Sequence, residues 1–220
     1  GERDFYFNRG ADGQLSVEET SKIRLDDFSI IHFGSATAFL PCPLQEAYLK
    51  MLSDARNLGS YISFDPNYRH LLYKDCIPSF IKQSRHFLDQ CDFLKLSDEE
   101  AMLLTQTDNL SSATTALRDR TNAVFCITLG EEGTLLSIGK ETFRVPSIPV
   151  TVADTTGAGD AFVGAVLFQL RNFIPGELRT LNAEIWYDIV AKANKAGART
   201  CEFFGAMESF KHLSNDIFGQ

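Results

Sequence analysis

The sequence predicts an α/β fold in which a mostly parallel sheet is covered by helices on both faces. Short apolar runs typical of strands alternate along the chain with segments of helical spacing, and this alternation is typical of a parallel sheet with crossover helices. Glycines and polar residues follow several of these runs, and one Gly-rich turn precedes a long apolar segment. The 220 residues are enough for one domain with a sizeable core, so we expect one domain over residues 1–220.

The elements of the first half are predicted by their apolar spacing and by the residues at their ends. Pro43 favours a helix start and Gly59 a helix stop. Ser97 followed by Glu100 predicts a capping box at the start of another helix. Strands are expected at residues 4–8, 29–34, 61–65 and 92–96, and helices at residues 43–58 and 77–88.

The elements of the second half follow from the same signals. An apolar run that ends at Gly130 predicts a strand, Gly139 predicts the turn of a hairpin, and the apolar run after Asp160 predicts a buried helix. A strand is expected at residues 123–128, hairpin strands at 134–138 and 142–145, an extended stretch at 147–152, and helices at 160–172 and 182–200.

Charge and cysteine usage narrow the class of protein. The net charge of −8 argues against nucleic acid or an anionic membrane as a partner, and no apolar run approaches the roughly 18 residues that a membrane span needs. The five cysteines are dispersed without C-x-x-C spacing, which favours reduced thiols and a cytoplasmic location. The four histidines show no metal-ligand spacing.

The Gly157-Ala158-Gly159 turn and the adjoining Asp160 are the strongest candidates for chemistry. The turn stands at the expected N-terminus of a helix, where free amides and the positive end of the helix dipole can bind an anion. A carboxylate beside an anion hole can take a proton from a hydroxyl group while the amides stabilise charge on a transferred phosphate. The alternative is that Asp160 only caps the helix.

Residues of ligand-binding type follow three of the predicted strands as well. They lie at residues 65–69, 97–100 and 130–133. Because ligands bind at the carboxyl ends of strands in open parallel sheets, we expect these residues and the Gly157 turn to share one edge.

The string Asp-Thr-Thr-Gly-Ala-Gly-Asp-Ala-Phe at residues 154–162 resembles the C-terminal signature of the ribokinase-like (PfkB) carbohydrate kinases, and most closely that of the fructokinases. The resemblance implies a three-layer α/β/α fold with a small β lid, and ATP-dependent phosphorylation of a sugar hydroxyl, most closely that of fructose to fructose 6-phosphate. Asp160 would be the base, and the amides of Gly157, Ala158 and Gly159 would form the anion hole.

The resemblance also assigns the nucleotide site. Thr128, Gly130 and Gly133 resemble the G-x-x-G nucleotide loop that follows a strand, and Asn194 matches a position that lines the adenine pocket. On this basis a bulky residue at Gly133 should weaken ATP binding and leave sugar binding unchanged. Read without the resemblance, the loop is a plain turn and Asn194 a helix-surface residue.

The substrate and metal residues are implied in the same way. Asp-Pro-Asn-Tyr-Arg at residues 65–69 resembles a fructokinase segment in which Asn67 and Arg69 would reach the sugar or the transferred phosphate. Ser97 to Glu100 resembles N-x-x-E, with Ser in place of Asn, and Glu100 would organise Mg²⁺ through water. The alternatives are an Asx turn with a surface Arg, and a capping box.

A monovalent cation such as K⁺ is a further implied ligand. Its oxygens would come from Asp154, Thr156 and the loop over residues 200–209. That loop departs from the usual small and basic residues of the family.

The start of the chain departs from the family. It opens in a predicted strand without Met, and it contains no Gly-Gly segment of the kind that holds the sugar. We therefore expect that an N-terminal part with most of the sugar site is missing, that residues 1–27 are partly lid, and that a homodimer could form through the lid. Residues 1–220 alone should then phosphorylate fructose poorly and be less stable than an N-terminally extended chain.

Several alternative functions remain open at this point. Ribokinase and 2-keto-3-deoxygluconate kinase are the nearest alternatives to fructokinase. A catalytically inactive, sugar-kinase-like binding or regulatory protein is an alternative of another class. A dinucleotide-binding oxidoreductase has little support because no G-x-G-x-x-G follows a strand.

Overall fold

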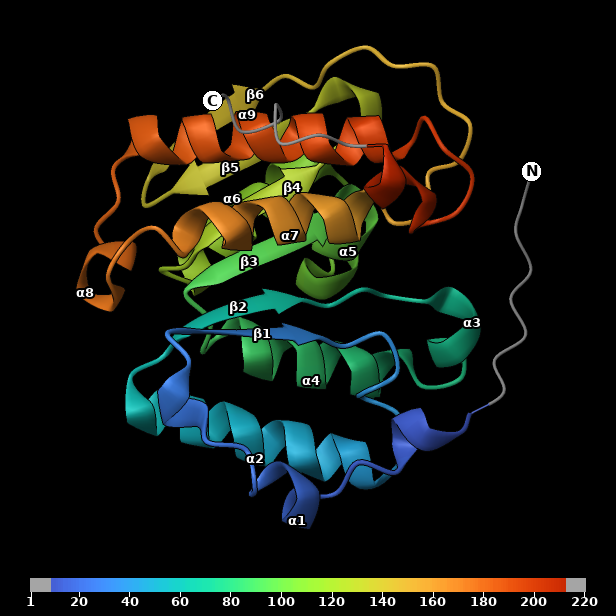
Figure 1. Cartoon of the computed structure of the whole chain (residues 1–220), viewed down its shortest axis with the longest axis vertical. Helices are drawn as coiled ribbons and strands as arrows, with labels where there is room; N and C mark the ends of the chain where they lie inside the picture. The colour runs from blue at the N-terminus through green and yellow to red at the C-terminus, as the bar shows by residue number, and fades with distance from the viewer. Residues whose placement is uncertain (1–8, 213–220) are drawn as a thin grey trace. The chain divides into compact units, whose positions relative to one another are not determined.

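The computed structural model describes residues 9–212, and the chain divides into two units, the first ending at Thr121 and the second beginning at Asn122. Figure 1 shows the elements of each unit along the chain. The strand predicted at residues 4–8 lies outside the described residues.

The first unit is built on three parallel strands, as predicted. Strand β1 (Ile30–Gly34) pairs with β2 (Tyr61–Asp65) and β2 pairs with β3 (Phe93–Ser97). Every residue of β2 is buried, as expected of a central strand in a parallel sheet. The carboxyl ends of β2 and β3 therefore lie side by side, with Asp65 at one and Ser97 at the other.

The helices predicted at 43–58 and 77–88 and the capped helix start after Ser97 are observed, whereas the other helices of this unit were not predicted. Helix α2 (Pro43–Leu58) begins with Pro and ends at Gly59, whose φ of 73° gives the left-handed helix stop. The remaining helices of the unit are α1 (Val17–Thr20), α3 (His70–Tyr73), α4 (Ile77–Leu88), α5 (Asp98–Thr105) and α6 (Leu110–Arg120), with short 3-10 turns η1 (Ala11–Gly13) and η2 (Leu25–Asp27). Residues 9–27, expected to be partly lid, contain η1, α1 and η2, and α1 packs on α2.

An aromatic cluster holds α2 and α4 against one face of the strands. The Phe87 ring of α4 lies 5.3 Å from both Phe33 of β1 and Phe64 of β2, measured between ring centroids, and Tyr48 of α2 lies 5.5 Å from Phe33. These rings are largely withdrawn from water, so apolar burial supplies most of the local stability.

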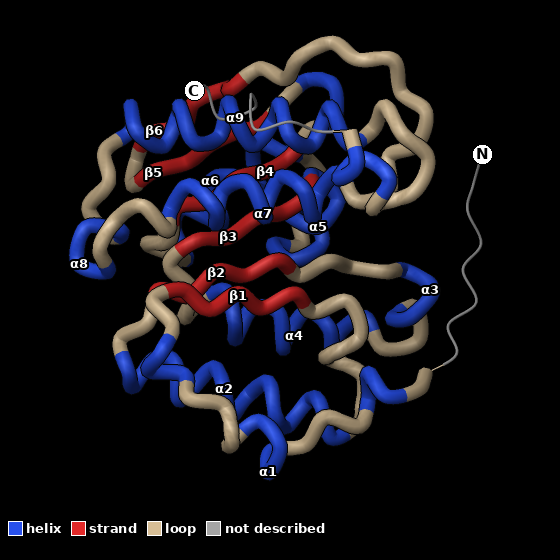
Figure 2. Tube along the Cα trace, in the orientation of Figure 1, coloured by secondary structure: helices blue, strands red, loops and turns tan. Residues whose placement is uncertain are grey.

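The second unit contains three antiparallel strands and two long helices. Strand β4 (Val124–Thr128) pairs with β5 (Thr134–Ile138), and the predicted hairpin joins β5 to β6 (Glu141–Val145). The helices are α7 (Ala158–Leu170), α8 (Pro175–Leu178) and α9 (Ala183–Thr200), with turns η3 (Gly130–Glu132) and η4 (Glu208–Lys211). The segment 147–152 forms no strand and belongs to the long loop between β6 and α7 (Figure 2).

Helices α7 and α9 pack along each other, and α9 also contacts β5 and β6 (Figure 1). Gly197 allows the close approach, because a Cβ atom there would lie 3.0 Å from the carbonyl oxygen of Ala158 in the first turn of α7. The N-terminus of α7 is thus placed by the helix that also carries Asn194.

Candidate active site

The start of α7 has the geometry of an anion-binding helix N-terminus. Gly157 is the N-cap residue with a φ of 84°, a conformation that favours glycine, and a Cβ atom there would lie 2.8 Å from Cβ of Ala206. The amide of Ala158 donates to the carbonyl oxygen of Thr155 (3.3 Å). The next amides of the first turn, those of Gly159 and Asp160, have no acceptor within the helix and are the better placed donors to an anion.

Asp154 fixes the loop before this turn. Its Oδ1 accepts hydrogen bonds from the amide (2.9 Å) and hydroxyl (2.8 Å) of Thr156, and its Oδ2 accepts one from the amide of Gly205 (3.0 Å). The carbonyl oxygen of Cys201 accepts the amides of Ala153 and Asp154. The structure therefore brings together the residues that the family resemblance associates with a monovalent cation, and Asp154 binds the loop that follows α9.

Asp160 lies exposed in the first turn of α7 and lines an open hollow of about 450 Å³. The other lining residues are mostly apolar: Gly157, Ala161, Gly164, Ala165, Phe168, Ala196, Thr200, Ala206, Met207 and Phe210. The carboxylate is accessible, which a proton acceptor for a bound hydroxyl group needs.

A second hollow, of about 550 Å³, unites the predicted nucleotide residues. Its lining includes all four of them, Thr128, Gly130, Gly133 and Asn194. It also includes Thr155, Ala158 and Gly159 from the start of α7. Sequence positions predicted separately as a nucleotide loop and as an anion hole thus line one space, which is the arrangement that a bound nucleoside triphosphate requires.

Asn194 is a buried anchor of this hollow. Its Oδ1 accepts the Thr134 hydroxyl (2.6 Å), and its Nδ2 donates to the carbonyl oxygens of Val145 (3.0 Å) and Pro146 (3.2 Å). The helix-surface alternative for Asn194 is wrong, because the side chain is buried and ties α9 to β5 and to the end of β6.

The apolar wall of the hollow was missed from the sequence. Ile148, Pro149, Val150 and Val152 line it from the loop after β6, and Phe162 lines it from α7. The available signal was an apolar run interrupted by proline, which does not form a strand but can present apolar surface to a ligand.

In the first unit, the Asp-Pro-Asn-Tyr-Arg segment forms a hydrogen-bonded turn after β2. Oδ1 of Asp65 accepts the amide of Asn67 (3.0 Å), which is the Asx turn named as the alternative, and Asn67 has a φ of 48°. Arg69 is exposed, and its Nη1 donates to the carbonyl oxygen of Tyr68 (3.1 Å). The turn therefore presents both predicted substrate residues at the end of a buried strand.

Glu100 forms the predicted capping box and also binds that turn. Its Oε2 accepts the amide of Ser97 and its Oε1 accepts the amide of Tyr68, both at 2.7 Å. Burial raises the pKa of Glu100 above its usual range, Lys95 opposes this shift, and Asp65 adds to it. Among residues 9–212 no group of three or more His, Cys, Asp or Glu side chains is placed to hold a metal ion.

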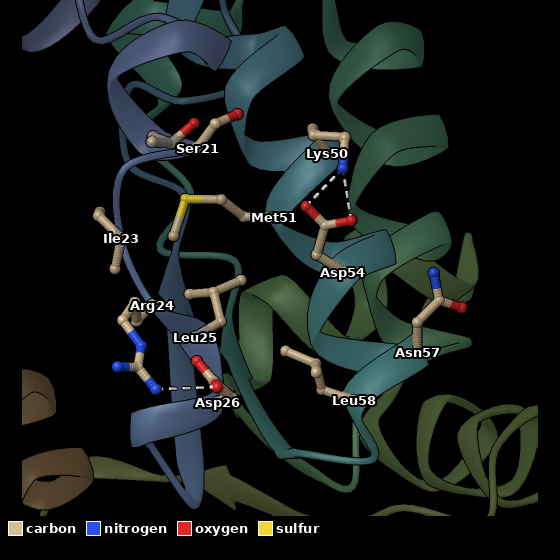
Figure 3. A pocket seen from close by; sticks show the side chains of 11 residues that line it. Ser21, Ile23, Arg24, Leu25, Asp26, Lys50, Met51, Asp54, Asn57 and Leu58 are labelled. Atoms are coloured by element: carbon tan, nitrogen blue, oxygen red, sulfur yellow. Dashed lines mark hydrogen bonds and ion pairs between the residues drawn. The ribbon is translucent and has the colours of Figure 1, made fainter.

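A third hollow lies on the first unit away from the predicted residues. It has a volume of about 430 Å³ and lies between η2 and α2 (Figure 3). Its charged side chains are paired: Lys50 with Asp54, and Arg24 with Asp26 and with the neighbouring Asp27. Exposed pairs of this kind offer no concentrated charge to a ligand.

Comparison with known proteins gives a family match over residues 1–213, to the pfkB family of carbohydrate kinases. The chain is 32% identical to probable fructokinase-4 of Arabidopsis thaliana, covering 94% of this chain and 63% of that protein. It is also 32% identical to aminoimidazole riboside kinase of Salmonella typhimurium, and this match likewise covers 94% of this chain and 63% of that protein. The chain therefore spans just under two thirds of the length of these relatives.

Solved structures show the same fold. An aminoimidazole riboside kinase from Salmonella enterica, complexed with aminoimidazole riboside and an ATP analogue, matches with a TM-score of 0.75 and 30% identity over 90% of this chain and 63% of its own. A fructokinase from Vibrio cholerae O395, bound to fructose, ADP and calcium ion, matches with a TM-score of 0.73 and 28% identity. The match covers 85% of this chain and 61% of the fructokinase chain. These matches confirm the predicted ribokinase-like α/β fold.

Proposed function

The chain belongs to the pfkB family of carbohydrate kinases, and we propose that the protein transfers the γ-phosphoryl group of ATP to a sugar hydroxyl. The observation that carries this proposal is the hollow lined both by the predicted nucleotide residues and by the start of α7. The five cysteines are all free, which supports a cytoplasmic location, and among the described residues no helix is long and apolar enough to cross a membrane.

The chemistry follows from the accessible carboxylate and the helix amides. Asp160 accepts the proton of the attacking sugar hydroxyl, the sugar oxygen bonds to the γ-phosphorus, and the bond to the β-phosphate oxygen breaks to release ADP. The amides at Gly157, Ala158 and Gly159 stabilise negative charge on the transferred group. Of these, the amide of Gly159 is the best placed donor, because it has no acceptor within the helix. The Gly130 to Gly133 loop and Asn194 hold the base and ribose.

Asn67 and Arg69 contact the sugar or the transferred phosphate in this proposal. The Arg69 guanidinium is exposed at the end of β2, where it can donate paired hydrogen bonds to a phosphoryl group. Mg²⁺ would neutralise phosphate charge, with Glu100 binding it through water, and K⁺ would bind beside Asp154 and Thr156. A homodimer formed through the lid belongs to the same proposal and is tested by the mass of the protein in solution.

Fructose is the proposed acceptor, because fructokinases recur among the relatives at about 32% identity. A riboside is the second candidate, since aminoimidazole riboside kinase is matched at the same identity. Release of ADP should be measured with ATP and Mg²⁺ in the presence of fructose, ribose, 2-keto-3-deoxygluconate or aminoimidazole riboside. Turnover with one acceptor fixes the substrate, and nucleotide binding without turnover on any of them would favour the inactive, binding-protein alternative.

Substitution Ala198→Leu should weaken ATP binding. Ala198 is half-buried on α9 and lines the nucleotide hollow, so a larger side chain takes up space that the nucleotide needs. We expect Kd for ATP to rise by about tenfold, which corresponds to about 1.4 kcal/mol. Calorimetric titration with ATP measures the change.

Ala191→Leu is the matched control. Ala191 is half-buried on the same helix and is not among the residues that line the hollow. It should leave Kd for ATP within about twofold of that of the parent protein, well below the 1.4 kcal/mol of a tenfold change. Equal affinities in the two variants would show that the nucleotide lies elsewhere.

A further inference from the structure

Three buried charged residues meet where β2 and β3 end. Asp65 is 4% exposed, Lys95 7% and Glu100 5%. The Lys95 ammonium lies 3.2 Å from Oδ2 of Asp65, and its charge also favours the ionised form of Glu100. Buried ionised groups are costly unless paired, so a buried lysine that pairs with Asp65 and also stabilises the charge of Glu100 indicates a built arrangement rather than chance proximity.

Each carboxylate in this cluster holds one amide of the same turn. Asp65 accepts the amide of Asn67 (3.0 Å), and Glu100 accepts the amide of Tyr68 (2.7 Å). Asn67 is one of two non-glycine residues with positive φ in the described part of the chain, and such a conformation persists only where its surroundings hold it. The two successive hydrogen bonds supply that support.

Ser35, the residue after β1, also binds the backbone of this turn. The Ser35 amide donates to the carbonyl oxygen of Asp65 (3.1 Å), and the Ser35 hydroxyl donates to the carbonyl oxygen of Pro66. The backbone of residues 65–68 is therefore held at several points, and only the carboxylate contacts depend on charge.

We infer that Lys95 is a positioning residue, which acts through Asp65 and Glu100 to hold the turn that presents Asn67 and Arg69. This inference rests on the proposed function, in which those two side chains contact the sugar or the transferred phosphate. Without the ammonium, the buried carboxylates of Asp65 and Glu100 would repel each other with no lysine charge to offset theirs, and this repulsion would drive them off the amides that they hold. Arg69 follows Tyr68 directly, so a small displacement of the turn moves the guanidinium away from the reacting group.

The test is the substitution Lys95→Met in the whole protein, with amide exchange and kinetics measured together. The amides of Asn67 and Tyr68 should exchange with solvent at least about tenfold faster, because their acceptors are displaced. The value of kcat should fall by about tenfold to a hundredfold, with KM for ATP within about twofold, since the nucleotide hollow contains only residues of the second unit. Lys50→Met is the control, because it removes an exposed ion pair with Asp54 on α2 (Figure 3) and should change neither quantity.

Two further variants keep the test decisive if Lys95→Met folds poorly. Asp65→Asn keeps the shape of the side chain and removes its charge, and it should speed exchange at Asn67 and lower kcat. Adding Asp65→Asn to Lys95→Met removes one of the two uncompensated carboxylates, so the double variant should lose less activity than the product of the single effects. Independent effects of the two substitutions would overturn the inference.

Two other outcomes would also overturn it. Unchanged exchange at Asn67 and Tyr68 would show that the charge does not hold the turn. Faster exchange with unchanged kcat would show that the turn takes no part in the reaction. Failure of the proposed function is a separate result: absence of ADP release by the parent protein with every acceptor tested would remove that function and leave the exchange behaviour of the turn as predicted.

Discussion

Substitution Asp160→Asn should lower kcat by about 10²–10⁴, the usual worth of a positioned general base. The carboxylate is exposed in the first turn of α7 and lines a hollow of its own, so a bound hydroxyl group can reach it. Asn keeps the shape of the side chain and cannot accept the proton. Because Asp160 does not line the nucleotide hollow, KM for ATP should change by less than about threefold.

Steady-state kinetics of the protein with ATP, Mg²⁺ and the accepted sugar measure this effect. Asp188→Asn provides the control, because Asp188 is an exposed acid on α9 that pairs with Lys192. It should leave kcat unchanged within error. Near-normal turnover in Asp160→Asn would contradict the role of Asp160 as the base and would favour the alternative that it only caps the helix.

Local signals predicted most of the fold. Pro43 and Gly59 bracket α2 as expected, Ser97 and Glu100 form the expected capping box, and the hairpin turns at Gly139. These features depend on residues close together in the sequence, and for this reason they can be read from it. The segment 147–152 shows the limit: it was predicted as an extended stretch, but tertiary contacts decide that its apolar residues line a hollow.

The candidate site was predicted in part. The four nucleotide residues and the start of α7 line one hollow, in line with the order of motifs along the chain. Lys95 was not predicted, because a lysine in a β-strand ordinarily faces solvent. Its burial follows from Asp65 on the neighbouring strand, a pairing between residues far apart in the sequence. The second hydrogen bond of Glu100 was missed for the same reason. Besides the nearby amide of Ser97, its carboxylate accepts the amide of Tyr68, which is far away in the sequence.

The expectation for a bulky residue at Gly133 needs correction, because the structure gives this glycine a folding role. Gly133 has a φ of 91° and a ψ of −134°, a region that is essentially restricted to glycine. A Cβ atom there would lie 2.7 Å from the amide nitrogen of Ser147 and 2.9 Å from the carbonyl carbon of Pro146, and closer still to the carbonyl oxygen of Val145. A loss of ATP affinity in a Gly133 variant would therefore not separate damage to the backbone from a lost contact with the nucleotide.

Substitution Gly133→Ala should destabilise the protein by about 3 kcal/mol or more, because the methyl group overlaps backbone atoms that cannot rotate away. For a chain of this size the midpoint of thermal unfolding should fall by about 6–12 °C. Gly130→Ala is the matched control: Gly130 also has positive φ, 59°, but a Cβ atom there meets nothing within 4 Å. This variant should lose only the stability that the left-handed backbone conformation costs a non-glycine residue, about 1 kcal/mol, and its midpoint of thermal unfolding should fall by about 2–4 °C. Thermal unfolding of the two variants separates overlap from backbone strain, and equal midpoints would show that the contact between Gly133 and the end of β6 does not set the stability of this loop.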